Sequence, residues 1–377
     1  MNSLDELLHP VTLDQFRAEY EDRKPLHVPA GTDRRKAAAL TWNAFNALLD
    51  QSSLWTAGSL RLMRNHTPVP PEEYCRPVKT PDGTVMRPSA GMVEVFLSAG
   101  ASAVANDVLH LHPPLTRIGQ ALGETYAALV GANVYCSFQG VRAFGTHFDN
   151  HDVFVIQTEG EKVWTLYENR ALNPVDPPED TAETRRWFEQ TRGRVLQEVV
   201  MRPGDVLYLP RGWYHDALAV EGASLHVTFS VTPLYGRILL SLLDNAAMQN
   251  PAFRAWLPPA RQEDGRALQR RLAELGEMLA AIVATPEFRD EVAMAQRRLV
   301  ARPAGFSLPT RKPVTLYRTT GRAFPRSSTA LEVIYGWAVQ ERQFALEEMI
   351  AQFDFLSEQE VRAGVDAAET AGALEKL

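Results

Sequence analysis

The sequence has few cysteines and no long apolar run. Only Cys75 and Cys136 occur among the 377 residues; they lie far apart and form no pairing motif, so we expect reduced thiols and a cytoplasmic protein. No apolar stretch approaches the roughly 20 residues that cross a bilayer. The first residues lack the basic start and apolar segment of a signal peptide. We therefore expect neither secretion nor a membrane partner.

An excess of positive charge is also missing. The formal net charge is -7 at pH 7, whereas a general nucleic-acid binder usually presents a basic field. This balance predicts no direct nucleic-acid partner. With 45% hydrophobic and 23% charged residues, the composition is that of an ordinary globular protein, and the length allows two or three domains.

His147 and Asp149 are the first candidates for metal binding. In extended backbone, residues two positions apart face the same side, so one imidazole and one carboxylate converge. A second imidazole would complete the two-His-one-carboxylate triad that holds non-haem Fe(II) and leaves coordination positions open. The candidate for that imidazole is His215, which follows a short β-rich segment.

The surrounding sequence strengthens the His-x-Asp signal, which is weak by itself. β-rich segments follow the pair at 153–157 and 162–167, and two more occur at 206–209 and 223–231. The metal candidates therefore lie on or between the strands of an antiparallel barrel.

Other polar residues near these strands have open roles. Asn133 and Tyr135 alternate along one strand and could face a ligand or simply pack. His226, Thr228 and Ser230 alternate along the last barrel strand and could line the pocket, but the sequence does not fix which way they face. For His226 the default expectation is a hydrogen-bonded core histidine. The pair His110 and His112 has no third ligand nearby, so a role in a loop or at a helix start is favoured over metal binding.

Helical periodicity flanks the barrel on both sides. On the N-terminal side we expect helices at 12–22, 42–49, 92–99 and 115–130, and an irregular excursion over 65–90. After Pro233 we expect helices at 239–248, 267–284 and 287–300, and the first of them carries more leucines than one small helix needs. In the tail, Ser357 and Glu360 have the spacing of a capping box.

A likeness to a known family is carried by two segments. They are His147-Phe-Asp-Asn-His-Asp-Val-Phe-Val-Ile-Gln157 and Pro203-Gly-Asp-Val-Leu-Tyr-Leu-Pro-Arg-Gly-Trp-Tyr-His215. They resemble the JmjC branch of the cupin superfamily of Fe(II)/2-oxoglutarate oxygenases, and within it the ribosomal oxygenases. The likeness is strong over the barrel and weaker over the first 130 residues.

The resemblance implies an α+β fold in three domains. Residues 1–235 would form a JmjC oxygenase domain, a double-stranded β-helix (cupin/JmjC barrel) with N-terminal helices. Residues 236–302 would form a helical domain of the dimerisation type, and residues 303–377 a small winged-helix-like domain. Because such helices join two subunits in ribosomal oxygenases, the resemblance also implies a homodimer.

The resemblance implies an activity as well. The chain would be an Fe(II)- and 2-oxoglutarate-dependent hydroxylase that uses molecular oxygen on a side chain of a protein or peptide, such as a ribosomal protein. Iron would be held by His147, Asp149 and His215. Asn133 and Tyr135 would contact the co-substrate.

Lys162 has the position of the co-substrate anchor in this family, fifteen residues after His147. By resemblance it would bind the distal carboxylate of 2-oxoglutarate. Strand alternation puts Lys162 on the same face as Trp164 and Leu166. A cation on a largely apolar strand face needs an anion, because an unpaired buried charge is costly.

Three other functions are weighed against this one. The first is a tailoring hydroxylase of a peptide natural product or small molecule. The second is a lysine demethylase, which is disfavoured because the sequence has no histone-reader module. The third is a non-catalytic cupin-like binding protein, which Lys162 disfavours because a structural metal site has no need of a dicarboxylate anchor.

Overall fold

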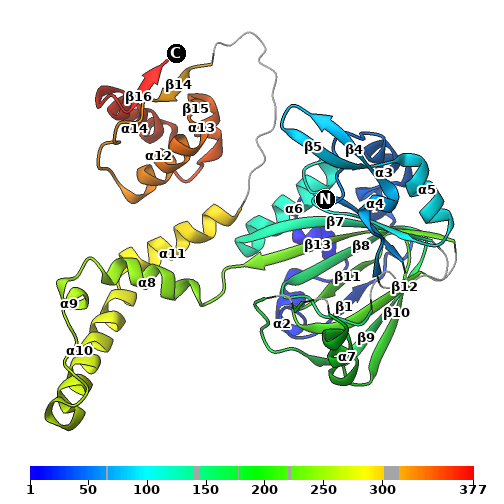
Figure 1. Cartoon of the computed structure of the whole chain (residues 1–377), viewed down its shortest axis with the longest axis horizontal. Helices are drawn as coiled ribbons and strands as arrows, with labels where there is room; N and C mark the ends of the chain where they lie inside the picture. The colour runs from blue at the N-terminus through cyan, green and yellow to red at the C-terminus, as the bar shows by residue number, and fades with distance from the viewer. Residues whose placement is uncertain (65–66, 139–144, 177, 180, 220–221, 301–313) are drawn as a thin grey trace. The chain divides into compact units, whose positions relative to one another are not determined.

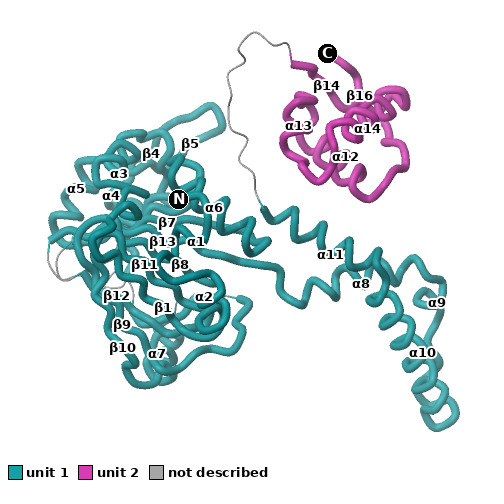
Figure 2. The backbone as a smooth tube through the Cα atoms, turned by 180° about the vertical axis from the view of Figure 1, so that it is seen from behind, with its two compact units in different colours: residues 1–301 teal, residues 302–377 magenta. Residues whose placement is uncertain are grey.

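The structure, a computed structural model, describes residues 1–64, 67–138, 145–176, 178–179, 181–219, 222–300 and 314–377. The chain divides into two compact units, Met1–Ala301 and Arg302–Leu377 (Figure 2). The predicted boundary at 302/303 lies outside the described residues. The predicted separation of residues 1–235 from 236–302 stays a prediction, because both fall within the first unit. No helix among the described residues is long and apolar enough to span a membrane.

Two antiparallel sheets form the barrel of the first unit (Figure 1). The larger has the order β1-β11-β8-β13-β7-β6-β2-β3, and the smaller has the order β10-β9-β12. In chain order the strands of the larger sheet are β1 (Leu26–Val28), β2 (Leu60–Arg64), β3 (Thr67–Pro68), β6 (Ser102–Ala105), β7 (Ala128–Phe138), β8 (Asp152–Glu159), β11 (Val206–Leu209) and β13 (Ala223–Pro233). Those of the smaller are β9 (Lys162–Arg170), β10 (Val195–Met201) and β12 (Trp213–Ala219). These sheets confirm the predicted antiparallel barrel and its mixed α and β composition.

Strand alternation divides the apolar residues of β8 between two cores. Phe154 and Ile156 pack into the core that the larger sheet shares with the N-terminal helices. Val153 and Val155 belong instead to a cluster inside the barrel, with Trp164. Because successive side chains point to opposite faces, one strand closes the outer core and lines the interior at the same time.

The N-terminal helices cover the outer face of the larger sheet. α6 contacts β7 and β13, and α1 contacts α6. Thr12 and Thr41 cap α2 and α3 by accepting hydrogen bonds from backbone N–H groups of the first turn. The helices are α1 (Leu4–Leu8), α2 (Leu13–Glu19), α3 (Trp42–Leu49), α4 (Pro71–Tyr74), α5 (Ala90–Ser98) and α6 (Pro113–Tyr126), and a 3-10 turn spans Arg35–Ala39.

Two expectations for this region were wrong. The segment 65–90 is not irregular, because it contains a hairpin of β4 (Cys75–Thr80) and β5 (Gly83–Pro88). The helix expected at 115–130 ends at Tyr126, since Ala127 adopts a left-handed conformation with φ 47° and the chain then enters β7. Apolar residues continue across that junction, so periodicity alone could not locate it.

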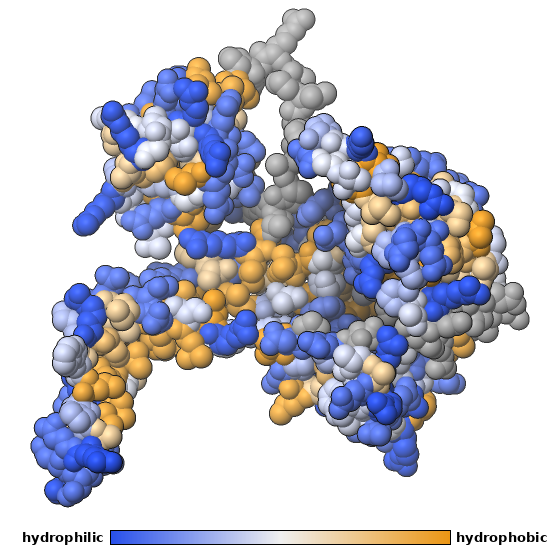
Figure 3. Space-filling view, in the orientation of Figure 1, coloured by the Kyte–Doolittle hydropathy of each residue, from blue (hydrophilic) through white to orange (hydrophobic). Residues whose placement is uncertain are grey.

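Four helices follow the barrel: α8 (Ile238–Ala247), α9 (Pro251–Arg254), α10 (Arg266–Val283) and α11 (Pro286–Leu299). α8 contacts both α10 and α11. Several of their large apolar side chains remain exposed, and Figure 3 shows apolar residues gathered along these helices. The three helices predicted after Pro233 are therefore confirmed, and each of their ends lies within one residue of the predicted position.

The second unit combines short helices with a three-stranded sheet. Its described elements are β14 (Leu316–Thr319), α12 (Thr329–Glu341), β15 (Gln343–Ala345), α13 (Leu346–Gln352), α14 (Glu358–Thr370) and β16 (Leu374–Lys376), with the sheet order β15-β14-β16. The predicted capping box is present: Ser357 and Glu360 bond reciprocally at the start of α14. The winged-helix assignment stays a prediction.

Candidate metal centre

The candidate site is a cavity of about 140 Å³ between the two sheets of the barrel. Both sheets contribute side chains, from β7, β8 and β13 on one side and from β9 and β12 on the other. The cavity is lined by Asn133, Tyr135, His147, Asp149, His151, Val153, Lys162, Trp164, His215, Ala217, His226, Thr228 and Ser230. All six residues predicted for the site therefore line one cavity.

His147, Asp149 and His215 come together within it. Their candidate ligand atoms all lie within 4.8 Å of one another, and they are the only such group of three among the described residues. Nε2 of His215 is 3.6 Å from a carboxylate oxygen of Asp149. The two imidazole ring centres are 4.5 Å apart. This spacing suits three ligands around one ion. The geometry is therefore consistent with the predicted metal role of these residues.

The backbone holds the two histidines opposite each other. His147 N–H donates to the carbonyl of His215 at 3.0 Å, and His215 N–H donates back to the carbonyl of His147 at 2.9 Å. This isolated antiparallel bridge joins the segment after β7 to the start of β12. Gly212 N–H donates to the carbonyl of Asp149 at 2.7 Å, which fixes the third residue of the group. Gly212 has φ +80° and a Cβ there would lie 2.1 Å from a backbone oxygen, so glycine is required.

Each histidine directs Nε2 away from its own backbone. Nδ1 of His147 lies 2.9 Å from the carbonyl of Gly145, and Nδ1 of His215 lies 2.9 Å from the carbonyl of Trp213. A carbonyl oxygen can only accept, so each Nδ1 carries the proton and donates it. Nε2 is then the unprotonated ring nitrogen, and this is the tautomer that a metal-binding histidine needs.

The charges at this group favour ligation at neutral pH. Burial, and to a smaller extent the nearby His147, lower the pKa of His215 to about 4, although Asp149 opposes the shift. Burial raises the pKa of Asp149, but attraction to His151, His147 and His215 outweighs it and the net shift is downward. A neutral imidazole and an ionised carboxylate are the states in which these residues donate electron pairs to a metal.

Lys162 supplies a buried cation in the same cavity. Its side chain is 3% exposed, and Nζ donates to Oγ of Ser137 at 3.4 Å. Burial lowers the pKa of Lys162 to about 8. The ion pairs of the described residues include none with Lys162. A buried ammonium without a carboxylate partner is costly, so this position is suited to an anionic ligand.

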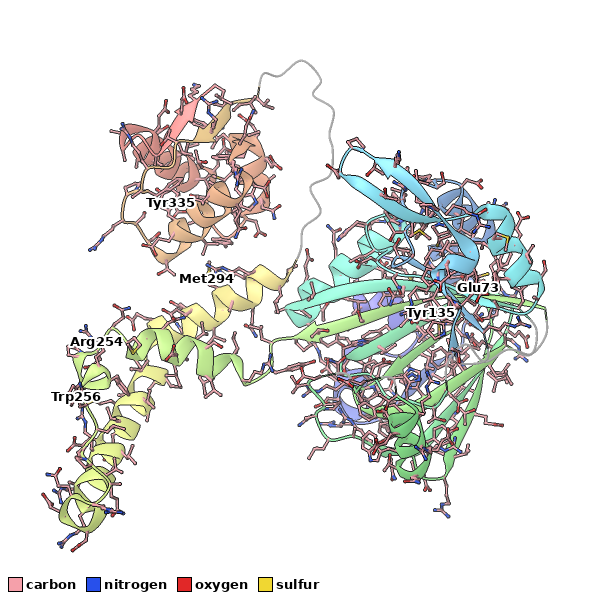
Figure 4. The ribbon with its side chains drawn as sticks, in the orientation of Figure 1. Glu73, Tyr135, Arg254, Trp256, Met294 and Tyr335 are labelled. Atoms are coloured by element: carbon pink, nitrogen blue, oxygen red, sulfur yellow. The ribbon has the colours of Figure 1, made fainter. Side chains whose placement is uncertain are left out.

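The other candidates surround this ammonium. The ring of Tyr135, labelled in Figure 4, stacks on the imidazole of His226 with centres 4.8 Å apart and planes 4° apart. Oδ1 of Asn133 accepts a hydrogen bond from the backbone N–H of Asp107 at 3.1 Å, so that atom is engaged by the fold. Co-substrate contact by Asn133 and Tyr135 stays a prediction.

For His226 the structure favours the pocket-lining alternative over the default of a hydrogen-bonded core histidine. It is 2% exposed, but it lines the cavity, and among the described residues its Nδ1 has no hydrogen-bond partner. The alternation of His226, Thr228 and Ser230 along the strand indicates a shared face, and in the structure all three side chains line the cavity. The register in which β13 pairs with its neighbours decides this orientation, and that register cannot be read from the sequence.

His112 lies outside the cavity, whereas His151 lines it. His112 precedes the first residue of α6, and it belongs to no group of three potential ligands within the described residues. His151 lines the cavity, whereas Asp152 is turned into the fold and accepts from the backbone N–H of Arg211 at 2.8 Å. The helix-start role expected at 110–112 is confirmed for His112, which is the N-cap residue of α6.

Comparison with known proteins gives concordant results. Residues 110–237 match the JmjC domain family. The chain is 30% identical over 229 residues to the bifunctional lysine-specific demethylase and histidyl-hydroxylase NO66 of Aedes aegypti, covering 60% of this chain and 34% of that protein. It is 28% identical over 230 residues to the protein of the same name from Drosophila persimilis, covering 60% and 31%. The chain thus spans about a third of the length of these curated relatives.

Solved structures extend the likeness to the whole chain. The ribosomal oxygenase YcfD of Escherichia coli superposes with a TM-score of 0.51 at 16% identity, covering 97% of this chain and 98% of that one. The structure of YcfD with cobalt and 2-oxoglutarate gives the same TM-score and identity over 96% and 97%. At this identity the likeness shows the fold. Residues 110–237 therefore match the JmjC domain family, and the chain as a whole is similar in fold to YcfD.

Proposed function

We propose that this chain is an Fe(II)- and 2-oxoglutarate-dependent oxygenase that hydroxylates a side chain of a protein or peptide. One observation carries the proposal: three potential metal ligands and an unpaired buried ammonium share one cavity. A two-His-one-carboxylate set is typical of non-haem iron oxygenases. A structural metal site would not need the ammonium.

The residues of the cavity have distinct roles in this proposal. His147, Asp149 and His215 would hold Fe(II) on one side and leave its other side open to the co-substrate and molecular oxygen. When bound, the iron and 2-oxoglutarate would supply the oxidising power that a C–H bond requires. Lys162 would bind the distal carboxylate and so orient the keto acid. Asn133 and Tyr135 would complete the wall of the co-substrate site.

The protein also keeps the site dry. Trp164, Val153 and Ala217 form apolar parts of the cavity wall. An apolar wall strengthens the attraction between Lys162 and a carboxylate, because the local dielectric is low. It also holds the target C–H in place without competition from water.

The relatives support a protein substrate. NO66 is named for acting on lysine and histidine side chains, and YcfD is named a ribosomal oxygenase. We infer that this chain also acts on a protein, such as a ribosomal protein. A small-molecule or peptide tailoring activity is the competing outcome of the substrate test.

We further propose that the chain forms a homodimer through α8, α10 and α11 and works in the cytoplasm. Leu240 on α8 is 70% exposed and Leu272 on α10 is 52% exposed, and Trp256 between these helices is 96% exposed (Figure 4). Exposed apolar side chains in one region are suited to a protein interface. The two cysteines are free and buried, which suits a reducing compartment.

The test is turnover followed by substrate identification. We expect succinate to form from 2-oxoglutarate when Fe(II) is supplied, and an added oxygen atom in the intact mass of a ribosomal protein or peptide. His147→Ala should abolish both signals. Oxidation of small molecules alone would favour the tailoring hydroxylase. Unchanged metal binding in His147→Ala, together with no turnover in the parent protein, would favour a non-catalytic binding protein.

A further inference from the structure

Strand alternation gives the metal centre a second, outward face. His147 and His215 point into the cavity, so their chain neighbours Thr146 and Asp216 point out of it. Tyr167 lies on the outward face of β9, opposite to the cavity-lining Lys162. All three outward residues are nonetheless buried, with exposed fractions of 5%, 1% and 3%. Something outside the barrel therefore covers them.

The cover comes from the segment between β9 and β10. It contains α7 (Ala182–Thr191), and Arg192 follows this helix directly. Nη1 of Arg192 donates to Oγ1 of Thr146 at 3.0 Å and to the hydroxyl of Tyr167 at 2.5 Å. The guanidinium also lies over the Tyr167 ring, 4.5 Å from its centre. Arg192 thus links the segment that carries His147 to β9 on the side that faces away from the cavity.

Asp216 closes the network. Its Oδ2 accepts from the hydroxyl of Tyr167 at 2.5 Å and from Oγ1 of Thr146 at 3.1 Å. The Thr146–Asp216 bond runs parallel to the backbone bridge between His147 and His215. The network therefore contains a buried carboxylate and a guanidinium, joined through two hydroxyl groups. We call these four residues, Thr146, Tyr167, Arg192 and Asp216, the outer clasp.

We propose that the outer clasp consists of positioning residues that fix the separation of the His147 and His215 imidazoles and thereby set the affinity for the metal. This inference rests on the proposed function, because it assumes that the two histidines bind a metal. Each histidine is one residue away from a clasp member, and short backbone segments carry the constraint. None of the four residues lines the cavity, so none touches a ligand of the site directly.

The expected effect is moderate. Groups that bond directly to a ligating residue typically change metal affinity by roughly 10–100-fold. The clasp acts through the backbone rather than through an imidazole nitrogen. We therefore expect its disruption to weaken metal binding by about three- to tenfold, below that range.

Tyr167→Phe is the main test, and Tyr214→Phe is its matched control. Tyr167→Phe removes the hydroxyl that joins Arg192 to Asp216 and keeps the ring. Tyr214 is also buried and next to His215, but its hydroxyl bonds to Oγ1 of Thr191 at 2.7 Å and takes no part in the clasp. Both variants lose one buried hydroxyl near the site, with two hydrogen bonds in Tyr167→Phe and one in Tyr214→Phe. A merely structural effect should lower the Tm of both variants and leave the spectrum of the bound ion unchanged.

The measurements are Co(II) titration of the metal-free protein and its thermal midpoint. We expect Tyr167→Phe to raise the Kd for Co(II) and to alter the visible absorption of the bound ion, while Tyr214→Phe leaves both unchanged at a comparable Tm. Equal Kd values and spectra for the parent and Tyr167→Phe, with tight Co(II) binding in the parent, would overturn the clasp alone. Absence of Co(II) binding in the parent would overturn the proposed metal site, and the clasp with it.

Thr146→Val covers the case in which Tyr167→Phe does not fold. Valine keeps the shape of threonine and removes both hydrogen bonds of Oγ1, to Arg192 and to Asp216. The same loss of Co(II) affinity is expected. Parent-like affinity in a folded Thr146→Val protein would contradict the proposal.

Discussion

The barrel and the helices that follow it differ in how far their apolar side chains are buried. In the barrel, Phe154, Tyr208 and Phe229 are fully buried, and every strand of the larger sheet has a partner. In the helices after Pro233, Leu240 and Trp256 remain largely exposed. The barrel thus builds its cavity from its own residues, whereas the exposed apolar residues of the helices support the proposed homodimer. Five predictions test this division, in decreasing order of expected effect.

Replacing a predicted ligand should affect the barrel alone. We expect His147→Ala to weaken metal binding by more than about 100-fold, beyond the range for groups one step removed from a metal. Turnover should fall below detection. Calorimetric titration with Mn(II) measures the first effect, and circular dichroism checks that the fold is kept. Metal binding at the parent level would contradict the assigned ligand role.

Removing the buried ammonium should act on the co-substrate. We expect Lys162→Met to weaken 2-oxoglutarate binding by about 2–5 kcal/mol, because one partner of a buried charge pair is lost. The metal Kd should not change, which separates this effect from that of His147→Ala. Steady-state KM for 2-oxoglutarate is the measurement. An unchanged KM would show that the dicarboxylate is held elsewhere.

Introducing charge into the exposed helices should act on assembly and not on the cavity. We expect Leu240→Glu combined with Trp256→Ala to convert a dimer into a monomer, as measured by light scattering after gel filtration, with metal affinity retained. Leu172→Glu is the matched control, because Leu172 is 90% exposed in the barrel region. A parent protein that is already monomeric at micromolar concentration would contradict the proposed dimer.

The pKa of Lys162 predicts a pH dependence. Below its pKa of about 8 the ammonium is charged and binds the dicarboxylate; above it the free protein loses that charge. The KM for 2-oxoglutarate should therefore rise with pH, by about tenfold per unit above pH 8. In Lys162→Arg this rise should disappear, since a guanidinium keeps its charge. A flat KM in the parent up to about pH 9.5 would contradict a direct contact.

The smallest effect is expected in the second unit. Ser357→Ala removes the side chain that accepts from the backbone N–H of Glu360 at the start of α14. The loss of such a cap costs about 1 kcal/mol. We expect a lower thermal midpoint for the second unit and unchanged metal binding. A shift in metal affinity would show that the two units are coupled.

Most of the cavity could be predicted from the sequence because its residues follow local rules. His147 and Asp149 are two apart in extended chain, and Lys162 shares a strand face with Trp164, which also lines the cavity. The sequence leaves the direction of His226 open between the core and the pocket, because the register of β13 against its neighbours sets it. A pairing register is a long-range property that one strand does not encode.

The outward face could not be predicted for a related reason. Arg192 belongs to the segment between β9 and β10, and its partners in the outer clasp, Thr146 and Tyr167, lie on two other segments. β10, which follows that segment, was likewise missed, since its residues Val195 and Leu196 are exposed and show no alternation of burial. Where the contacts are distant in sequence, residue types and spacing carry little information.

The bridge between His147 and His215 has a consequence for how the site can change. A strand register can slip only by whole residues, and a slip of one turns every side chain to the opposite face. Inserting or deleting a single residue between Gly145 and Asp149 would thus send a ligand toward α7 and bring Thr146 or Phe148 into the cavity. Substitutions can tune this centre gradually, but changes in segment length would remove it in one step.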